Sequence, residues 1–156
     1  MTASGGYGAG QPDQPTGRNT VSNSTITLAH VEAKFGVAML DHLDRQAEIP
    51  TVTKAACQGD VSILRVTTKS ATTPLPQAGV AVVRGENGGH THSVHGARCF
   101  YDPAEGGSLT LGTLTVPDGG EAFLLHPEHG GLAIAPGTYR VGRQREFAGE
   151  WRMVSD

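Results

Sequence analysis

Hydrophobic and polar residues alternate along much of the chain after residue 60, a pattern that favours β-strands. The alternating or β-branched segments are DVSILRVTT, GVAVVRG, ARCFYD, SLTLGTLTV, EAFLLH, LAIA and TYRVGRQREF. Glycine- and proline-rich turns such as PLP, ENGG, DPAEGG, PDGG and APG separate them. Several short strands at this spacing predict a mainly β fold, either a small barrel or a sandwich. The closing WRMVSD is expected to add a short strand or to lie across the barrel end.

A helical period precedes the strands. The apolar side chains that share one helix face are Leu28, Val31, Phe35, Ala38, Met39 and Leu43. This spacing predicts a helix over about residues 27–45, with Ser24 or Thr27 as N-cap and Pro50 limiting the other end. Residues 1–23 carry almost no large apolar side chains, so we expect a flexible arm there. Residues 24–156 are then a single mainly β domain with an N-terminal helix.

Composition narrows the classes of protein. The chain has 156 residues, 37% of them hydrophobic and 17% charged, which suits one modest core. A formal net charge of −3 argues against nucleic-acid binding, which needs a basic face, although four arginines cluster locally near the C-terminus. They are Arg140, Arg143, Arg145 and Arg152.

The two cysteines, the N-terminal residues and the lack of long apolar runs predict a cytoplasmic protein that does not span a membrane. Cys57 and Cys99 form no CxxC pair, and we expect both to be reduced thiols. The first residues resemble no signal peptide, and no apolar run approaches the roughly 20 residues that span a bilayer. Nucleotide-binding GxxxxGK[ST], HExxH and G-x-S-x-G motifs are absent from the sequence.

Five of the seven histidines lie in two short segments. GENGGHTHSVHG holds His90, His92 and His95, and LLHPEHGG holds His126 and His129. Residues i and i+2 of a strand point to the same face, so His90 and His92 can offer two imidazoles to one cation. His126 or His129, from a distant strand, would supply the third ligand.

This ligand set predicts a divalent metal without choosing among zinc, iron, nickel and copper. Glu128 would serve as a further ligand or as the carboxylate that orients an imidazole, and His95 is a supporting candidate. Two alternatives remain. The histidines are structural residues of polar turns, or a metal-free acid–base site uses His92 and His129, or one histidine with Glu128.

GENGGHTH resembles the first motif of the cupin superfamily, in which a glycine precedes H-x-H on a strand of a small barrel. GTLTVPDGG, with Gly112, Pro117 and Gly119, is similar to the start of the second cupin motif. The resemblance implies that His90 and His92 bind a metal together with a later histidine. Ala122 stands where the second motif has its histidine, and His126 follows it.

The chain is also similar to a group of small bacterial and phage proteins. They share a GH-x-H segment, an H-x-EHG segment and an ending like PGTYRVGRQREF, and the likeness implies no activity. It favours treating Gln144, Arg145 and Glu146 as one unit with the histidines. Arg145 and Gln144 would bind a carboxylate or phosphate, or else belong to a solvated strand edge.

Two functions therefore compete. The first is a cupin-like domain that binds a divalent metal and acts on a small-molecule ligand. The second is a non-enzymatic interaction or assembly module, such as a phage-like or homo-oligomeric component, in which the histidines are structural.

Overall fold

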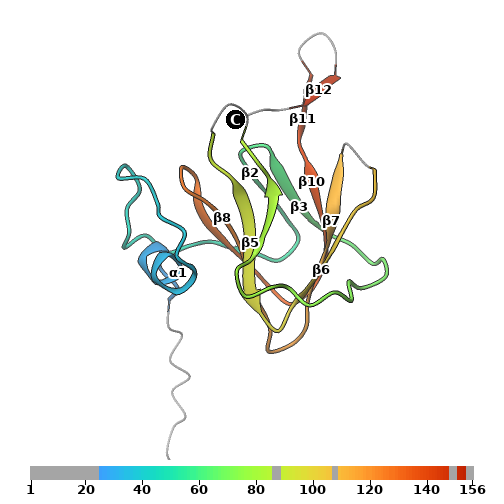
Figure 1. Ribbon diagram of the computed structural model, residues 1–156, viewed down its shortest axis with the longest axis horizontal. Coiled ribbons are helices and arrows are strands. Elements are labelled where there is room, and N and C mark those ends of the chain that lie inside the picture. The colour runs from blue at the N-terminus through green and yellow to red at the C-terminus, as the bar shows by residue number, and fades with distance from the viewer. Residues whose placement is uncertain (1–24, 86–88, 107–108, 148–150, 154–156) are drawn as a thin grey trace, which may run out of the picture.

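The computed structural model describes residues 25–85, 89–106, 109–147 and 151–153, and its strands form two five-stranded sheets (Figure 1). In order across the first sheet, the strands are β1 (Thr51–Val52), β9 (Gly130–Ile134), β8 (Glu121–His126), β5 (His92–Ala97) and β4 (Val80–Val83). In the second sheet they are β2 (Ala55–Gln58), β3 (Val61–Arg65), β10 (Gly137–Arg143), β7 (Thr110–Val116) and β6 (Phe100–Pro103). β11 (Arg145–Phe147) and β12 (Trp151–Met153) form a separate two-stranded sheet.

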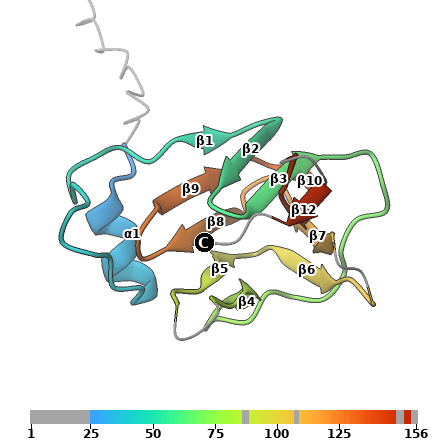
Figure 2. The same ribbon diagram turned by 90° about the horizontal axis from the view of Figure 1, so that it is seen from above.

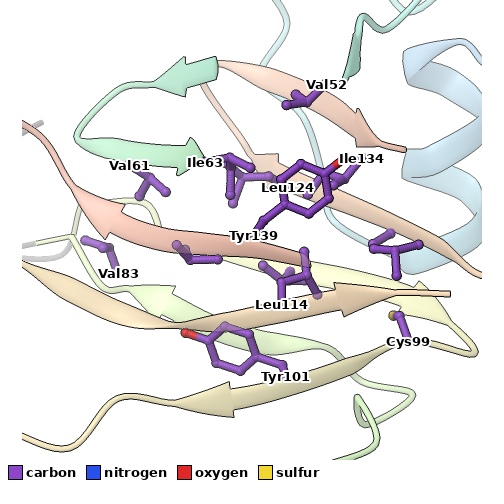
Figure 3. Packing of buried hydrophobic residues seen from close by; sticks show 14 residues of the cluster. Val52, Val61, Ile63, Val83, Cys99, Tyr101, Leu114, Leu124, Ile134 and Tyr139 are labelled. Carbon is purple, nitrogen blue, oxygen red and sulfur yellow. The ribbon is translucent and has the colours of Figure 1, made fainter. Parts of the chain in front are cut away.

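The main core fills the space between the two five-stranded sheets (Figure 3). Alternate residues of each strand point inward, as the pleat of a strand requires. On β10, for example, Tyr139 and Val141 are fully buried and Arg140 between them is exposed, as predicted. Leu114 on β7 and Leu124 on β8 meet them from the two sheets. The prediction of a mainly β fold is confirmed. Of the two predicted arrangements, a barrel or a sandwich, the two separate sheets form a sandwich.

The predicted segments all contain strands, including the short β12 in WRMVSD. Three strands lie outside them. β1 and β2 are short, with two and four residues, and their mixed burial hides the alternation. β5 runs through the first histidine segment and continues into ARCFYD.

Helix α1 (Leu28–Phe35) begins at the predicted Thr27, whose hydroxyl accepts a hydrogen bond from the backbone N–H of His30. The prediction that the helix continues to about residue 45 was wrong. Gly36 adopts a left-handed φ of 69° and donates its backbone N–H to the carbonyl of Glu32, which ends the helix.

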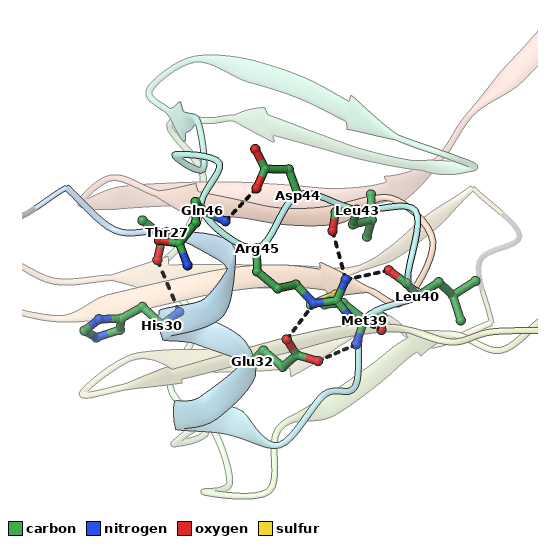
Figure 4. Close-up of polar contacts among 9 residues, drawn as sticks. All are labelled: Thr27, His30, Glu32, Met39, Leu40, Leu43, Asp44, Arg45 and Gln46. Atoms are coloured by element: carbon green, nitrogen blue, oxygen red, sulfur yellow. Dashed lines mark hydrogen bonds and ion pairs between the residues drawn. The ribbon is translucent and has the colours of Figure 1, made fainter.

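The segment after α1 is a loop held by Arg45 (Figure 4). The Arg45 guanidinium donates to the Glu32 carboxylate and to the carbonyls of Met39, Leu40 and Leu43. Glu32 also accepts the backbone N–H of Met39, and these bonds lower the pKa of its carboxyl group. The loop is thus folded back onto the helix.

Together α1 and this loop cover the outer face of the first sheet beside β8 and β9 (Figure 2). Leu28, Val31 and Met39 pack there against Phe123 and Leu125, which point away from the main core. β8 is therefore buried on both faces, a feature that explains its continuous apolar run EAFLLH.

The predictions for the N-terminal arm, the two cysteines and membrane-spanning helices can also be compared with the structure. The arm predicted for residues 1–23 lies outside the described residues, and the domain limits at 24–156 stay a prediction. Cys57 is exposed and Cys99 is buried, and the two thiols are not joined. Burial raises the pKa of Cys99 to about 11. None of the helices in the described part of the chain has the length and apolar character needed to cross a membrane.

Candidate functional site

Two buried histidines lie side by side at one end of the first sheet. His92 begins β5 and His126 ends β8, and the register that pairs Ser93 with Leu125 brings them together. Both point toward the facing sheet because they share strand parity with the core residues Val94 and Leu124. Their exposed fractions are 1%, and their ring centroids are 4.1 Å apart.

His129 joins this pair from the turn between β8 and β9. Its ring centroid lies 4.5 Å from that of His126 and 5.8 Å from that of His92. The three rings are nearly parallel, with interplanar angles between 19° and 28°. One ligand nitrogen of each residue lies within 4.8 Å of the other two. We call His92, His126 and His129 the histidine cluster; its third member is exposed.

A buried carboxylate from the second sheet faces the cluster. Asp60 lies in the turn between β2 and β3, is 5% exposed, and places Oδ1 3.3 Å from Nδ1 of His92. An acceptor at this position favours the proton on Nδ1 and directs the Nε2 lone pair toward the opposite side of the ring. Asp60 thus has the geometry of the carboxylate that orients a metal-binding imidazole.

Gln144 holds the turn that carries Asp60. Its side-chain Nε2 donates to the carbonyl of Gly59 at 2.7 Å, and its backbone N–H donates to the carbonyl of Asp60 at 2.8 Å. Because Gln144 follows β10 directly, these bonds connect the last strand of the sandwich to the site. Gln144, one residue of the predicted QRE unit, is thus connected to His92 through the turn that carries Asp60.

A second amide ties the two sheets together below the cluster. Nε2 of the buried Gln58 donates to the carbonyl of Gly130, which pairs with His126 across β8 and β9. Gln58 Oε1 is buried, and no hydrogen-bond partner for it is found among the described residues. Gln58, Asp60 and the two buried histidines make this end of the core polar.

His126 already uses one ring nitrogen. Its Nδ1 accepts the backbone N–H of Glu128 at 3.2 Å, so the neutral ring carries its proton on Nε2. A cation bound through Nδ1 would replace this hydrogen bond, and one bound through Nε2 would require the ring proton to move to Nδ1.

His90 lies beside the cluster and not within it. It precedes β5, and its ring centroid is 6.1 Å from that of His126 in an edge-on arrangement. Its Nδ1 lies 3.1 Å from Oε1 of Glu128, and both side chains are partly exposed. The structure therefore brings the predicted His90 and Glu128 together as a pair at the rim of the site.

His95 lies on the opposite face of the first sheet. It lies three positions after His92, and an odd spacing along a strand reverses the side-chain direction. Its ring packs 5.3 Å from that of Phe35 on α1, and Nε2 lies 2.9 Å from the Ser93 hydroxyl. Burial lowers the pKa of His95 below its usual 6.5. His95 is thus part of the contact between the sheet and the helix.

The exposed side of the cluster opens beside a small pocket of about 160 Å³. This pocket is lined by one residue of α1, by residues of the loop that follows the helix and by the turn that carries His129. They are Leu28, Leu43, Asp44, Ala47, Glu48, Ile49, Pro50, His129, Gly130 and Gly131. Arg145, the remaining predicted residue, lies away from the cluster and lines a different pocket on the outer face of the second sheet.

Sequence reasoning missed Asp60 and Gln58. Both flank a turn between two strands, where QGD resembles any polar turn. The signal that marks them is three-dimensional, because a buried acid or amide in a small sandwich needs a partner. Here the partners of this turn come from segments far along the chain.

The family model of a domain of unknown function, DUF8820, matches residues 57–144. This range includes the histidine cluster, Asp60 and Gln144, and leaves out α1. No curated protein and no solved structure matches the chain significantly. Because the family match covers more than half of the 156 residues, the protein belongs to the DUF8820 family.

Proposed function

We propose that this protein binds one divalent transition-metal ion through His92, His126 and His129. The observation that carries the proposal is the convergence of three imidazole nitrogens within 4.8 Å of one another. Zinc–nitrogen bonds of about 2.0–2.1 Å place tetrahedral ligand atoms about 3.4 Å apart. Binding one ion would therefore require the three nearly parallel rings to turn toward a common point.

The donor set supports a borderline metal. Three imidazoles suit zinc, iron, nickel or copper, whereas calcium and magnesium prefer oxygen ligands. Asp60, 3.3 Å from His92, supplies the outer carboxylate that histidine ligands commonly have. With three protein ligands, a metal ion keeps at least one open position and can act as a Lewis acid on a small molecule.

The open position belongs on the His129 side. His92 and His126 are buried, while His129 is exposed and lines the pocket of about 160 Å³. A small-molecule ligand would therefore approach beside His129. The paired His90 and Glu128 lie beside the cluster, where they would exchange a proton with a ligand bound to the metal.

The proposed centre modifies the cupin-like prediction. It keeps His92 from the H-x-H pair and takes both candidates of the second segment, His126 and His129, as ligands. His90 becomes a neighbour of the metal instead of a ligand, because its Nδ1 faces Glu128.

Metal titration tests the proposal. Chelator-treated protein is titrated with Zn²⁺ by calorimetry and with Co²⁺ by visible absorption, for the wild type, His126→Ala and His30→Ala. His30 is an exposed histidine on α1 and serves as the matched control. We expect one ion per chain in the wild type and in His30→Ala, and loss of stoichiometric binding in His126→Ala. Absent binding in the wild type, or unaltered binding in His126→Ala, would favour structural histidines in an assembly module.

A further inference from the structure

The outer face of the second sheet carries a row of polar and small residues where β10 lies between β3 and β7 (Figure 1). Arg140 on β10 is exposed and stands opposite Thr113 on β7. A bulge between Val141 and Gly142 then shifts the register, so that Gly142 stands opposite Thr110. On its other side Gly142 pairs with Ser62 of β3.

Gly142 allows a close approach in this row. A Cβ atom at this position would lie 2.8 Å from the carbonyl oxygen of Leu109, so no larger residue fits without a shift of the backbone. The backbone N–H of Arg143 donates to that same carbonyl at 2.8 Å. The start of β7 is thereby fixed beside the arginine-bearing end of β10.

Two adjoining pockets follow this row. The first, of about 290 Å³, is lined by Ser62, Leu109, Thr110, Arg140, Gly142, Arg143 and Arg145. The second, of about 380 Å³, is lined by Val66, Thr68, Lys69, Thr110, Thr113 and Arg140. Thr110 and Arg140 belong to both linings, so the two pockets are neighbours, and we call them together the arginine groove.

The arginine groove is cationic in a chain with a net charge of −3. Three guanidinium groups and one ammonium group line it, and no aspartate or glutamate is among the described residues of either lining. Among the described residues, Arg140, Arg143 and Arg145 form no ion pair, in contrast to Arg45, which pairs with Glu32. Three cations gathered without counter-ions repel one another, and an anion would relieve that repulsion.

Phosphate is the anion that fits these donors. Guanidinium groups bind phosphate oxygens through paired hydrogen bonds, and the hydroxyls of Ser62 and Thr110 add further donors. A volume of about 290 Å³ is near the lower end of small-molecule sites and has room for two linked phosphate groups. Among the described residues that line the two pockets none is aromatic, so these residues offer no stacking surface of the kind that single-stranded nucleic acids use.

We propose that the arginine groove binds the diphosphate group of a phosphorylated small molecule. Arg143 and Arg145 bind the phosphate oxygens in the first pocket, and Arg140 stands between the two pockets. The second pocket then receives the remainder of the ligand. This proposal does not require the metal centre, because none of the three histidines of the cluster lines the groove.

Calorimetric titration with inorganic diphosphate tests this site. The buffer contains a chelator and a fixed salt concentration, so that neither a metal-bound diphosphate nor screening alters the result. The variants are Arg143→Gln and Arg145→Gln, with Arg84→Gln as the control. Arg84 is an exposed arginine that follows β4 in the other sheet and lines neither pocket. We expect about tenfold weaker binding or more in the two groove variants, and unchanged binding in the control.

A second measurement on the wild type does not depend on how the variants fold. In ¹H–¹⁵N spectra, diphosphate is expected to shift the amide signals of Thr110 and Gly142, while an equal concentration of sulfate shifts them less. The proposal is overturned by absence of binding or by an equal loss in Arg84→Gln. It is also overturned if a short single-stranded oligonucleotide binds and diphosphate does not, since the groove would then be a nucleic-acid surface.

Discussion

Nδ1 of His92 lies 3.3 Å from Oδ1 of Asp60, and the two residues come from different sheets of the sandwich. Their side chains are 2% and 6% exposed, so the contact is shielded from water. In such surroundings a carboxylate holds an imidazole strongly in one orientation and one tautomer. This contact therefore fixes how the His92 ring is oriented within the histidine cluster.

The substitution Asp60→Asn is expected to weaken metal binding without removing it. The asparagine side chain keeps the size of the aspartate but lacks the negative charge that orients His92. Loss of an outer-sphere carboxylate typically costs 10–100-fold in metal affinity, and we expect a decrease in that range for Zn²⁺. Competition titration with a chromophoric chelator measures it, and Asp118→Asn, in the exposed turn between β7 and β8, is the control. Equal affinities for Zn²⁺ in the two variants would show that Asp60 does not contribute to metal binding.

The positions of His90 and His129 predict opposite results for two similar substitutions. His129→Ala removes a proposed ligand, so the metal-to-protein ratio should fall well below one. His90→Ala removes only the neighbour paired with Glu128 and should leave the ratio near one. The ratio is measured after dialysis against a small excess of Zn²⁺. The reverse pattern would support the ligand set implied by the cupin resemblance.

Gln144→Ala is expected to affect stability and the metal site together. The variant loses the hydrogen bond of 2.7 Å to Gly59, worth about 0.5–1.5 kcal/mol, and releases the turn that carries Asp60. Chemical denaturation should therefore show a lower free energy of unfolding, and titration a weaker affinity for Zn²⁺. Gln46→Ala, at an exposed loop position, should change neither quantity. A loss of stability with unchanged affinity would separate Gln144 from the site.

The buried His95 makes stability depend on pH in a stated direction. Its pKa is lower in the folded protein than the usual 6.5, because burial disfavours the charged ring. As the pH falls below about 6.5, the unfolded chain takes up this proton before the folded protein does, so folding stability decreases. Above that pH the contribution of His95 is complete.

His95→Leu should reduce this acid sensitivity. The free energy of unfolding, measured from pH 7.5 to pH 5 with a chelator present, is expected to fall less steeply in the variant than in the wild type. His30→Ala, which changes an exposed histidine, should retain the wild-type slope. Identical slopes in all three proteins would show that His95 does not titrate differently on folding.

The strands were predictable because their burial follows their sequence pattern. Tyr139 and Val141 alternate with the exposed Arg140, and this two-residue period appears directly in the sequence. The helix was extended too far for a related reason. Met39 and Leu43 continue the helical spacing, yet they reach the same apolar cluster from a loop, so burial alone cannot distinguish the two conformations. The left-handed Gly36 decides where the helix ends.

The candidate site was predictable as a group of histidines but not as a geometry. Strand parity places His92 and His95 on opposite faces, and only the observed limits of β5 show that His90 precedes the strand. Asp60 and Gln144 escaped notice as partners because their contacts join segments far apart in the sequence. Long-range contacts of this kind depend on how the two sheets face each other, which no local pattern specifies.

The most direct test of the metal proposal is the metal content of the untagged protein as purified, compared with a His92→Ala/His126→Ala double variant. Elemental analysis should find close to one transition-metal ion per chain in the wild type and almost none in the variant, with both proteins showing the same far-ultraviolet circular dichroism. Absence of metal from the wild type, even after refilling with zinc, iron, nickel and copper, would contradict the account. The histidine cluster would then be a structural part of the sandwich.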